Sequence, residues 1–150
     1  MKRVQMSDVL ITYADKLAAL EKEFRGIHKN LIKKKKSFNK NQQKVYNFVI
    51  GLTHIIQFNI HGKQYFIKRG DKNKGFEHIL LRHYGEGGKG RLTANNLLNI
   101  ATTIKMGSPY ASEKNDYTSI SNEFNGERYI IVLSKDRNGH WVVSYYSVDK

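Results

Sequence analysis

The first quarter of the chain has the hydrophobic periodicity of an α-helix. Large apolar residues recur three, four or seven positions apart, at Leu10, Leu17, Leu20, Phe24, Ile27 and Leu31. Side chains at these spacings lie on one helix face. The pattern predicts an amphipathic helix from residue 4 to about residue 36, with Ser7 as N-cap. The lysines at residues 33–36 end it, and the polar stretch that follows is either a solvated linker or the start of a second short helix.

Near Thr53 the pattern changes to that of β-structure. The stretches HIIQFNI and KQYFIKR are rich in β-branched and aromatic residues, and they flank the dipeptide His61-Gly62. Such stretches on either side of a two-residue loop predict a β-hairpin.

Two further helices are expected in the middle of the chain. The segment GFEHILLRH predicts a short helix from about Phe76 to Tyr84. A second helix should begin after Thr93 as N-cap and end at Gly107, with Pro109 beyond it. Its apolar stripe consists of Leu97, Ile100, Ala101 and Ile104.

The C-terminal third predicts a three-strand meander. The stretches DYTSISNEF, ERYIIVLSK and HWVVSYYS are joined by Asn125-Gly126 and Asn138-Gly139, and Asn-Gly is a strong hairpin signal. Turns at these two positions place Leu133 opposite both Ser144 and Thr118, and Ile131 opposite Tyr146. One sheet face would then carry Thr118, Ser144 and Tyr146. The core face, under the helices, would carry Ile130, Val132, Trp141, Val143 and Tyr145.

These elements predict an α+β fold. An N-terminal helical segment, residues 1–44, should precede one compact domain, residues 45–150, in which helices pack on an antiparallel sheet that ends in the meander. A chain of 150 residues is long enough for a single core.

The charge balance points to a polyanionic partner. Lys and Arg total 26 against 13 Asp and Glu, which gives a net charge of +13. A basic protein binds nucleic acid through counterion release, and it also attracts acidic proteins. The absence of cysteine excludes disulfides, thiolate metal ligands and a thiol nucleophile. No apolar run is long enough to span a membrane and the N-terminus lacks a secretory signal, so action in the cytoplasm is expected.

The histidines of GFEHILLRH are the first candidates for chemistry. At about 100° per residue, His83 shares the apolar face with Phe76 and Ile79, whereas His78 and Arg82 lie on the polar side. By this pattern alone His83 is a residue at the edge of the core, and His78 with Arg82 is a surface pair. The two histidines are five residues apart, which does not match the i,i+4 spacing of a helical zinc pair, and we expect neither a metal nor a cofactor.

The same residue types also equip a protein to cleave RNA. RNA supplies its own nucleophile, the ribose 2′-OH, so the protein needs only a base, an acid and cationic groups that stabilise the charge on the phosphorus. Histidine suits both proton transfers because it titrates near neutrality. Ser144 and Tyr146 are either ordinary strand residues or part of a face that binds phosphate.

The order of these elements resembles the phage and polymorphic-toxin nucleases of the Barnase-EndoU-colicin-RelE fold. The likeness covers residues 45–148 and rests on the hairpin, the GFEHILLRH helix, the entry into the second helix and a meander ending in WVVSYYS. It implies a metal-independent endoribonuclease with two helices and a four-stranded antiparallel sheet. Such enzymes often act as toxins against tRNA or mRNA. The expected partner is an acidic antitoxin or immunity protein.

The resemblance implies a set of site residues. His83 would be the principal acid or base with His78 as second choice, Arg82 the phosphate clamp, and Ser144 with Tyr146 the groups that orient the phosphate. The implied nucleic-acid-binding residues are Lys68, Lys89, Arg91, Thr118 and Arg128. Both histidines lie on one short helix, which leaves the assignment of acid and base open.

Two other functions fit the same sequence. The chain could be a basic nucleic-acid-binding module that stacks bases on Tyr or Phe without cleaving them. It could also be an adaptor that forms homo-oligomers through a coiled coil of its N-terminal helix.

Overall fold

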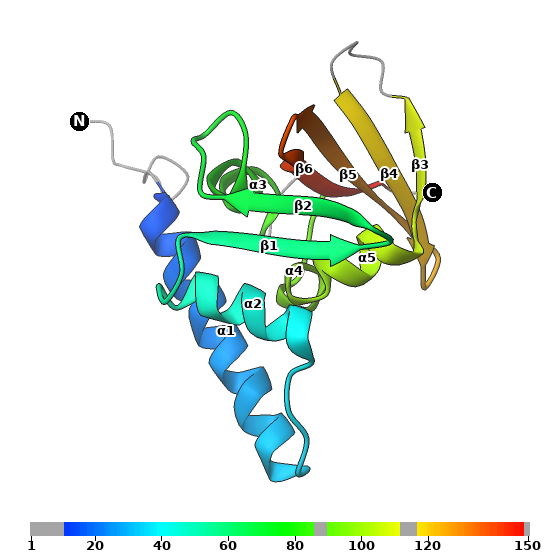
Figure 1. Cartoon of the computed structure of the whole chain (residues 1–150). Coiled ribbons are helices and arrows are strands. Elements are labelled where there is room, and N and C mark those ends of the chain that lie inside the picture. The colour runs from blue at the N-terminus through cyan, green and yellow to red at the C-terminus, as the bar shows by residue number, and fades with distance from the viewer. Residues whose placement is uncertain (1–10, 86–89, 112–116, 149–150) are drawn as a thin grey trace, which may run out of the picture.

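A computed structural model describes residues 11–85, 90–111 and 117–148. Within these ranges the chain has an α+β fold, with N-terminal helices followed by one six-stranded sheet (Figure 1). The helices are α1 (Tyr13–Lys33), α2 (Lys40–Val49), α3 (Phe76–His83), α4 (Ala94–Leu98) and α5 (Ile100–Met106). The strands are β1 (Ile55–Ile60), β2 (Lys63–Lys68), β3 (Ser108–Ala111), β4 (Tyr117–Phe124), β5 (Glu127–Asp136) and β6 (Gly139–Val148).

The sheet is mostly antiparallel. Its strand order is β1-β2-β6-β5-β4-β3, and the neighbours β2 and β6 form its parallel pair. The predicted α+β class and terminal meander are confirmed. The resemblance implied four antiparallel strands, and the described sheet is larger because the β1–β2 hairpin adds to one side of the meander and β3 to the other.

The N-terminal helix begins later than the periodicity suggested. Thr12 caps α1 in a reciprocal capping box with Asp15, in which each side chain accepts from the other residue's backbone N–H. The predicted cap, Ser7, lies outside the described residues. The polar stretch after the lysine run contains the cap of α2, Asn39, so the second-helix alternative is confirmed. The predicted boundary between residues 44 and 45 falls inside α2.

One apolar core joins the N-terminal helices to the sheet. Leu20 and Phe24 of α1 are fully buried, and they belong to the same cluster as Phe58 and Ile131 of the sheet. The end of α3 is also tied to α1, where the Tyr84 hydroxyl donates to Glu23. The prediction that residues 1–44 form a segment separate from the domain can be tested by limited proteolysis.

The first hairpin is confirmed. Ile60 pairs with Lys63 across a two-residue turn at His61 and Gly62, both of which have positive φ. Ile56 and Phe58 of β1 are buried toward the helices.

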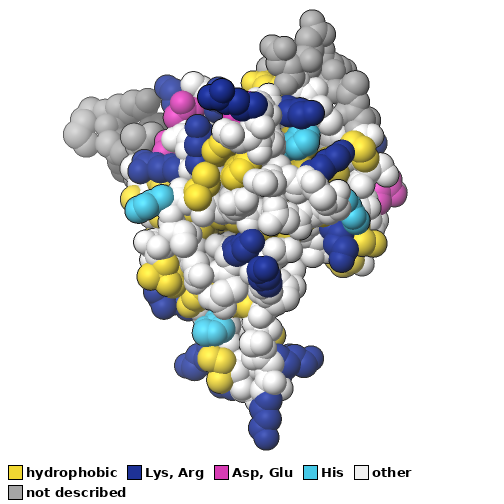
Figure 2. Space-filling view, in the orientation of Figure 1, with side chains coloured by type: hydrophobic (Ala, Val, Ile, Leu, Met, Phe, Trp, Pro, Cys, Tyr) yellow, Lys and Arg dark blue, Asp and Glu magenta, His cyan; other side chains and the backbone are white. Residues whose placement is uncertain are grey.

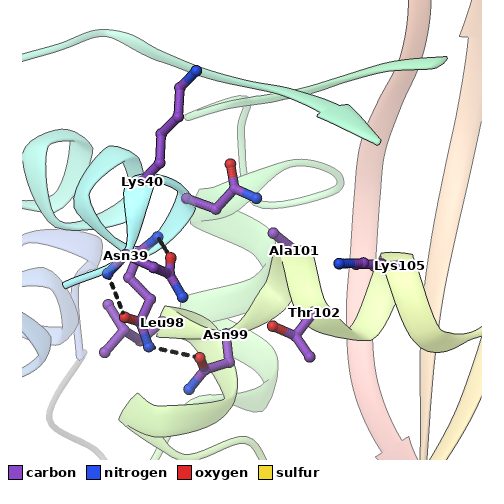
Figure 3. A pocket seen from close by; sticks show the side chains of 9 residues that line it. Asn39, Lys40, Leu98, Asn99, Ala101, Thr102 and Lys105 are labelled. Carbon is purple, nitrogen blue, oxygen red and sulfur yellow. Dashed lines mark hydrogen bonds between the residues drawn. The ribbon is translucent and has the colours of Figure 1, made fainter. Parts of the chain in front are cut away.

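The second predicted helix is interrupted at Asn99. Thr93 is the N-cap as expected, and Gly107 ends the helical region, but α4 stops at Leu98 and α5 starts at Ile100. The Asn99 side chain donates to the Asn95 carbonyl and accepts from Gln42 Nε2 of α2 at 2.8 Å (Figure 3). Side-chain bonds of this kind compete with helix hydrogen bonds, which accounts for the break.

The last turn differs from the prediction. Asn125-Gly126 joins β4 to β5 and Thr118 pairs with Leu133, as expected. In the next turn Asp136 pairs with Gly139, one residue earlier than predicted. Gly139 is not part of the two-residue turn. It allows β2 to approach closely, because a Cβ there would lie 2.6 Å from the Gln64 carbonyl oxygen of β2.

A β-bulge then shifts the register of β6. Leu133 pairs with Val142 but Val132 pairs with Ser144, so Val143 is the extra residue. The predicted partners of Ser144 and Tyr146 were therefore wrong, since Tyr146 pairs with Ile130.

The two faces of the sheet follow from this register. The core face carries Ile131, Leu133, Val142 and Tyr145, all almost fully buried. The opposite face, here called the outer face, carries Phe66, Arg128, Trp141, Ser144 and Tyr146 in register. Of the five residues predicted for the core face of the meander, only Tyr145 lies in the core cluster. Thr118 pairs with the buried Leu133, so it lies on the core face and not beside Ser144.

Candidate functional site

The candidate site forms where β2 and β6 separate. These strands pair only at Tyr65–His140 and Phe66–Trp141. Beyond Trp141 the edge of β6 is occupied by two glycines: Gly75 donates its N–H to the Val143 carbonyl, and the Gly90 carbonyl accepts from the Ser147 N–H. Gly75 immediately precedes α3, so its bond to β6 places α3 beside the C-terminal half of the strand.

A concavity of about 450 Å³ lies between α3 and β6. It is lined by His78, Arg82, His83, Gly90, Ser144, Tyr146, Ser147 and Val148. The five residues predicted as catalytic all border it. His78 and Ser144 are 66 residues apart in the chain, so the packing of α3 against β6 brings these side chains together.

His78 has the most defined geometry in this concavity. Its Nδ1 lies 3.1 Å from the Lys72 carbonyl oxygen, and its Nε2 lies 3.1 Å from Ser144 Oγ. A carbonyl only accepts hydrogen bonds, so Nδ1 carries the proton. In the neutral ring Nε2 is then an acceptor that faces the Ser144 hydroxyl. This is the arrangement of a base held by a second group, as proton-transfer chemistry requires.

His83 lies deeper, at the floor of the concavity. Its side chain is 8% exposed, and its ring centroid lies 5.4 Å from that of His78 and 5.5 Å from that of Tyr146. The helical pattern placed the two histidines about 140° apart. Their rings meet edge to face all the same, because His83 is the last residue of α3. His83 therefore has the burial of a core-edge residue and the position of a site residue.

Gly90 allows the chain to pass closely over this floor. It has a φ of +65°, and a Cβ there would lie 3.0 Å from Tyr146 Cβ and 3.3 Å from His83 Nδ1. A larger residue would have to displace Tyr146 or the Ser147 backbone and would adopt a strained φ. The Ser147 hydroxyl donates to the Arg91 carbonyl at 2.7 Å, which fixes the chain on the far side of Gly90.

The α3 end of the site is supported from α1. Lys16 Nζ donates to the Tyr84 carbonyl, and burial lowers the pKa of Lys16. Burial also raises the pKa of Tyr84, and the hydrogen bond from its hydroxyl to Glu23 raises that pKa further. The Tyr84 phenol therefore stays neutral and keeps donating, which holds the turn that follows His83.

Cationic side chains surround the concavity. Arg82 is exposed at its rim, Arg91 is exposed beyond Gly90, and Arg128 lies opposite Val148 on the outer face. Within the described residues the ion pairs are Arg25–Glu21 and Arg69–Glu77, and neither engages these three arginines. On the face of the molecule seen in Figure 2, Lys and Arg side chains also outnumber Asp and Glu.

The other predicted binding residues divide into three cases. Lys68 lies on the outer face over Trp141, next to the site. Thr118 lies on the core face and is not brought to the site. Lys89 falls outside the described residues.

The sequence pattern missed Trp141 as an outer-face residue and assigned it to the core. Asp136 carried the signal that corrects the turn, because its Oδ1 accepts from the backbone N–H groups of Asn138 and Gly139. An Asp two residues before such a position is typical of an Asx turn. Gly90 had no such signal beyond its place in a glycine-rich stretch.

A separate concavity of about 220 Å³ lies at the start of α2 (Figure 3). Lys40 and Lys105 border it, together with the Asn39 cap and the Gln42–Asn99 contact. It contains none of the predicted site residues and no titratable pair that could transfer protons, so it is a weaker candidate than the α3–β6 concavity.

Over the described ranges, no three His, Cys, Asp or Glu side chains converge as metal ligands would. No helix in the described part of the chain is long and apolar enough to cross a membrane. Comparison with models of known protein families and with curated proteins finds no match to this chain. Its function must therefore be argued from the α3–β6 concavity.

Proposed function

We propose that this protein is an endoribonuclease that cleaves RNA without a metal ion. The carrying observation is the contact of 3.1 Å between His78 Nε2 and Ser144 Oγ, in a concavity that also contains a second histidine and an arginine. The ribose 2′-O attacks the adjacent phosphorus, the bond to the 5′-oxygen breaks, and the products are a 2′,3′-cyclic phosphate and a 5′-OH. One proton leaves the 2′-OH and one proton reaches the 5′-oxygen.

His78 is the proposed base of this reaction. When RNA binds, the ribose 2′-OH replaces the Ser144 hydroxyl as the donor to Nε2, and Nε2 then takes the 2′-OH proton. The Lys72 carbonyl accepts from Nδ1–H in both the neutral ring and the imidazolium that forms. The contact with Ser144 favours His78 over His83 for the leading role, which reverses the order expected from the sequence. His83, the neighbouring ring, is the proposed acid that protonates the 5′-oxygen.

The remaining side chains act on the phosphate. Arg82, the exposed arginine at the rim, stabilises the negative charge that develops on the phosphate oxygens. Ser144 and Tyr146 carry hydroxyls on the same face of β6 and orient the same group. Arg91 and Arg128 contact phosphates farther along the strand.

The proposal extends to the setting of the activity. A protein with a net charge of +13 that cleaves RNA in the cytoplasm needs to be neutralised. An acidic antitoxin or immunity protein that covers the concavity would do this by charge complementarity. The proposed substrates, tRNA or mRNA, rest on the family resemblance.

The test is cleavage of total RNA by the purified protein in EDTA. The wild type should cleave, and His78→Ala and His83→Ala should not, while both variants keep the circular dichroism spectrum of the parent. His54→Ala is the matched control, because His54 is exposed and lies outside the concavity. Intact RNA with folded wild-type protein, or equal cleavage by all three variants, would overturn the proposal.

The second candidate function is RNA binding without cleavage. It is favoured by the partly exposed aromatic residues Phe66 and Trp141 on the outer face. A protein of this kind would retain RNA at low salt and leave it intact.

A further inference from the structure

Next to the proposed active site, the outer face carries an aromatic pair. The rings of Phe66 and Trp141 stack with centroids 4.8 Å apart and planes 25° apart. Both side chains are partly exposed. Lys68 is exposed, and its Nζ lies 5.0 Å from the centroid of the Trp141 ring.

Trp141, one ring of this pair, borders a second concavity of about 230 Å³ on this side of β6. Its lining includes Lys68, Lys74, Ser134, Asp136 and Trp141. This second concavity adjoins the active-site concavity along α3 and along β6. Gly75 lines the second concavity and lies three residues before His78, and Val143 lines it and lies immediately before Ser144. An RNA strand that leaves one concavity along β6 therefore enters the other.

The bulge at Val143 gives the two concavities a common face. Trp141 pairs with Ser134, and Ser144 pairs with Val132, so Trp141 and Ser144 point to the same side although they are three residues apart. In a regular strand residues three apart point to opposite sides. Their partners Ser134 and Val132 are two residues apart on β5, so Trp141 and Ser144 are separated by roughly 7 Å along the sheet, a suitable separation for neighbouring parts of one nucleic-acid strand.

The Trp141 indole is held in place by a hydrogen bond to Asp136. Trp141 Nε1 donates to Asp136 Oδ2 at 2.9 Å, and Asp136 Oδ1 is held by the backbone of Asn138 and Gly139. The hydrogen bond from the Asn138 backbone lowers the pKa of Asp136 most, and those from Trp141 and Gly139 lower it further, so the carboxylate stays ionised. A ring fixed in this way loses little conformational entropy when a ligand stacks on it.

A purely structural role is the alternative for this pair. Cross-strand aromatic pairs stabilise sheets, and a lysine over an indole adds a cation–π contact. Such a role does not require a neighbouring concavity, two lysines, and a place beside a histidine–serine contact. This combination is what single-stranded RNA requires, namely an aromatic surface for the base and cations for the backbone.

We propose that Trp141, stacked on Phe66, is a nucleobase-binding subsite for single-stranded RNA beside the scissile phosphate. The inference rests on the proposed function and names the form of its substrate. The base displaces the flexible Lys68 side chain from the indole, and Lys68 and Lys74 then contact the backbone phosphates. Duplex RNA does not fit this subsite, because its bases are paired and stacked on one another.

Trp141 is the only tryptophan of the chain, so its fluorescence reports directly on this subsite. The probe is a short single-stranded RNA of 2′-O-methyl nucleotides, which the proposed reaction cannot cleave. We expect saturable quenching by this probe, weak quenching by the same sequence as a duplex, and none by inorganic polyphosphate. Quenching by polyphosphate equal to that by the probe, or no quenching at all, would overturn the subsite.

Variants test the same claim by affinity. Trp141→Leu should weaken binding of the labelled probe by about five- to 150-fold, the range for one stacked base, and Phe66→Leu should weaken it less. Phe124→Leu is the matched control, since Phe124 is an exposed aromatic at the far end of β4. Equal affinity of a folded Trp141→Leu protein would contradict the proposal.

The two proposals fail in different ways. Quenching by the probe with no cleavage of ordinary RNA would leave the subsite standing and remove the nuclease. Cleavage of ordinary RNA without any fluorescence change on probe binding would keep the nuclease and remove the subsite.

Discussion

The two faces of β6 use the same strand for different purposes. On the core face Val142 and Tyr145 are almost fully buried, and they pack with Leu133 and Ile131 of β5. On the outer face Trp141, Ser144 and Tyr146 remain partly exposed and border two concavities. The bulge at Val143 determines which side chains of β6 lie on each face. One extra residue thus turns the C-terminal half of the strand so that Ser144 and Tyr146 face the concavity beside α3.

The hydroxyl groups on the two faces of β6 also have different partners. Tyr145 has its hydroxyl 3.4 Å from Thr103 Oγ1 and donates to the Asn96 carbonyl at 3.3 Å, so its polar atom is satisfied inside the protein. Burial raises the pKa of Tyr145, which keeps the phenol neutral. On the outer face the Ser144 hydroxyl instead contacts the ring of His78 at the concavity. The comparison predicts that outer-face variants affect chemistry and core-face variants affect stability.

The largest expected effect is the loss of proton transfer. His78→Ala and His83→Ala should each lower the rate of RNA cleavage by about a hundredfold to ten-thousandfold, the usual contribution of a general acid or base. His83→Ala should also lower the melting temperature because His83 is buried. The measurement is the single-turnover rate at a temperature where each variant is folded. A His83→Ala protein that melts earlier but cleaves at the parent rate would show that His83 is only structural.

The core face should give the opposite result. Ile131→Ala removes a fully buried side chain and should cost about 2–5 kcal/mol of unfolding free energy. Urea unfolding measures this loss. The cleavage rate per folded molecule should stay at the parent value, and a rate loss comparable to that of His78→Ala would break the distinction between the faces.

A smaller effect is expected from the cations on the outer face. Arg82→Gln and Arg128→Gln should each reduce the slope of log affinity against log salt by about 1, the value for one lost phosphate contact. Lys29→Gln is the control, because Lys29 is exposed on α1. An unchanged slope in both arginine variants would limit these residues to a role in solubility.

The smallest effect concerns His140, beside the β2–β6 pairing. Burial lowers the pKa of His140, and the charges of Lys135 and Lys63 lower it further. Its Nδ1 is buried without a hydrogen-bond partner in the described part of the chain. The unfolded state, with a histidine pKa of about 6.5, therefore binds the proton more readily than the folded state.

The sign of the pH effect follows from this difference. Stability is fully retained above about pH 6.5 and decreases as the pH falls from there toward the lowered folded-state pKa. His140→Gln should flatten this part of the stability profile, measured as urea midpoints between about pH 5 and 7.5. His54→Gln, an exposed histidine, should leave the profile unchanged, and a flattening in that variant instead would assign the effect to general charge.

Local patterns were sufficient to predict most elements. The Asn125-Gly126 turn, the His61-Gly62 turn and the Thr93 cap were all confirmed, because each depends on residues that are close in sequence. Asn138-Gly139 had an equally strong pattern but failed. The Asp136 side chain holds the backbone of Asn138 and Gly139 in an earlier turn, and Gln64 of β2 packs closely against Gly139, so a local contact and a distant one together shift the turn.

The arrangement of the site was predictable only in part. The sequence selected His78, Arg82, His83, Ser144 and Tyr146, and these residues do line one concavity. The pairing that brings Ser144 to His78 depends on the bulge at Val143, for which two adjacent valines gave no signal. The β2–β6 pairing was missed because its partners are remote in sequence. The strand β3 pairs with the next strand, β4, but it is only Ser108–Ala111 and contains Pro109, a residue type that argues against a strand.

The central claim is that the concavity between α3 and β6 cleaves RNA through the ribose 2′-OH. The most direct measurement maps a cleavage site in a short RNA in the presence of EDTA. The same strand is then tested with a single 2′-deoxy nucleotide on the 5′ side of the cleaved bond. We predict a 2′,3′-cyclic phosphate product from the RNA and no cleavage at the deoxy position. Cleavage of the deoxy strand at the same bond, or products without a cyclic phosphate intermediate, would contradict this mechanism.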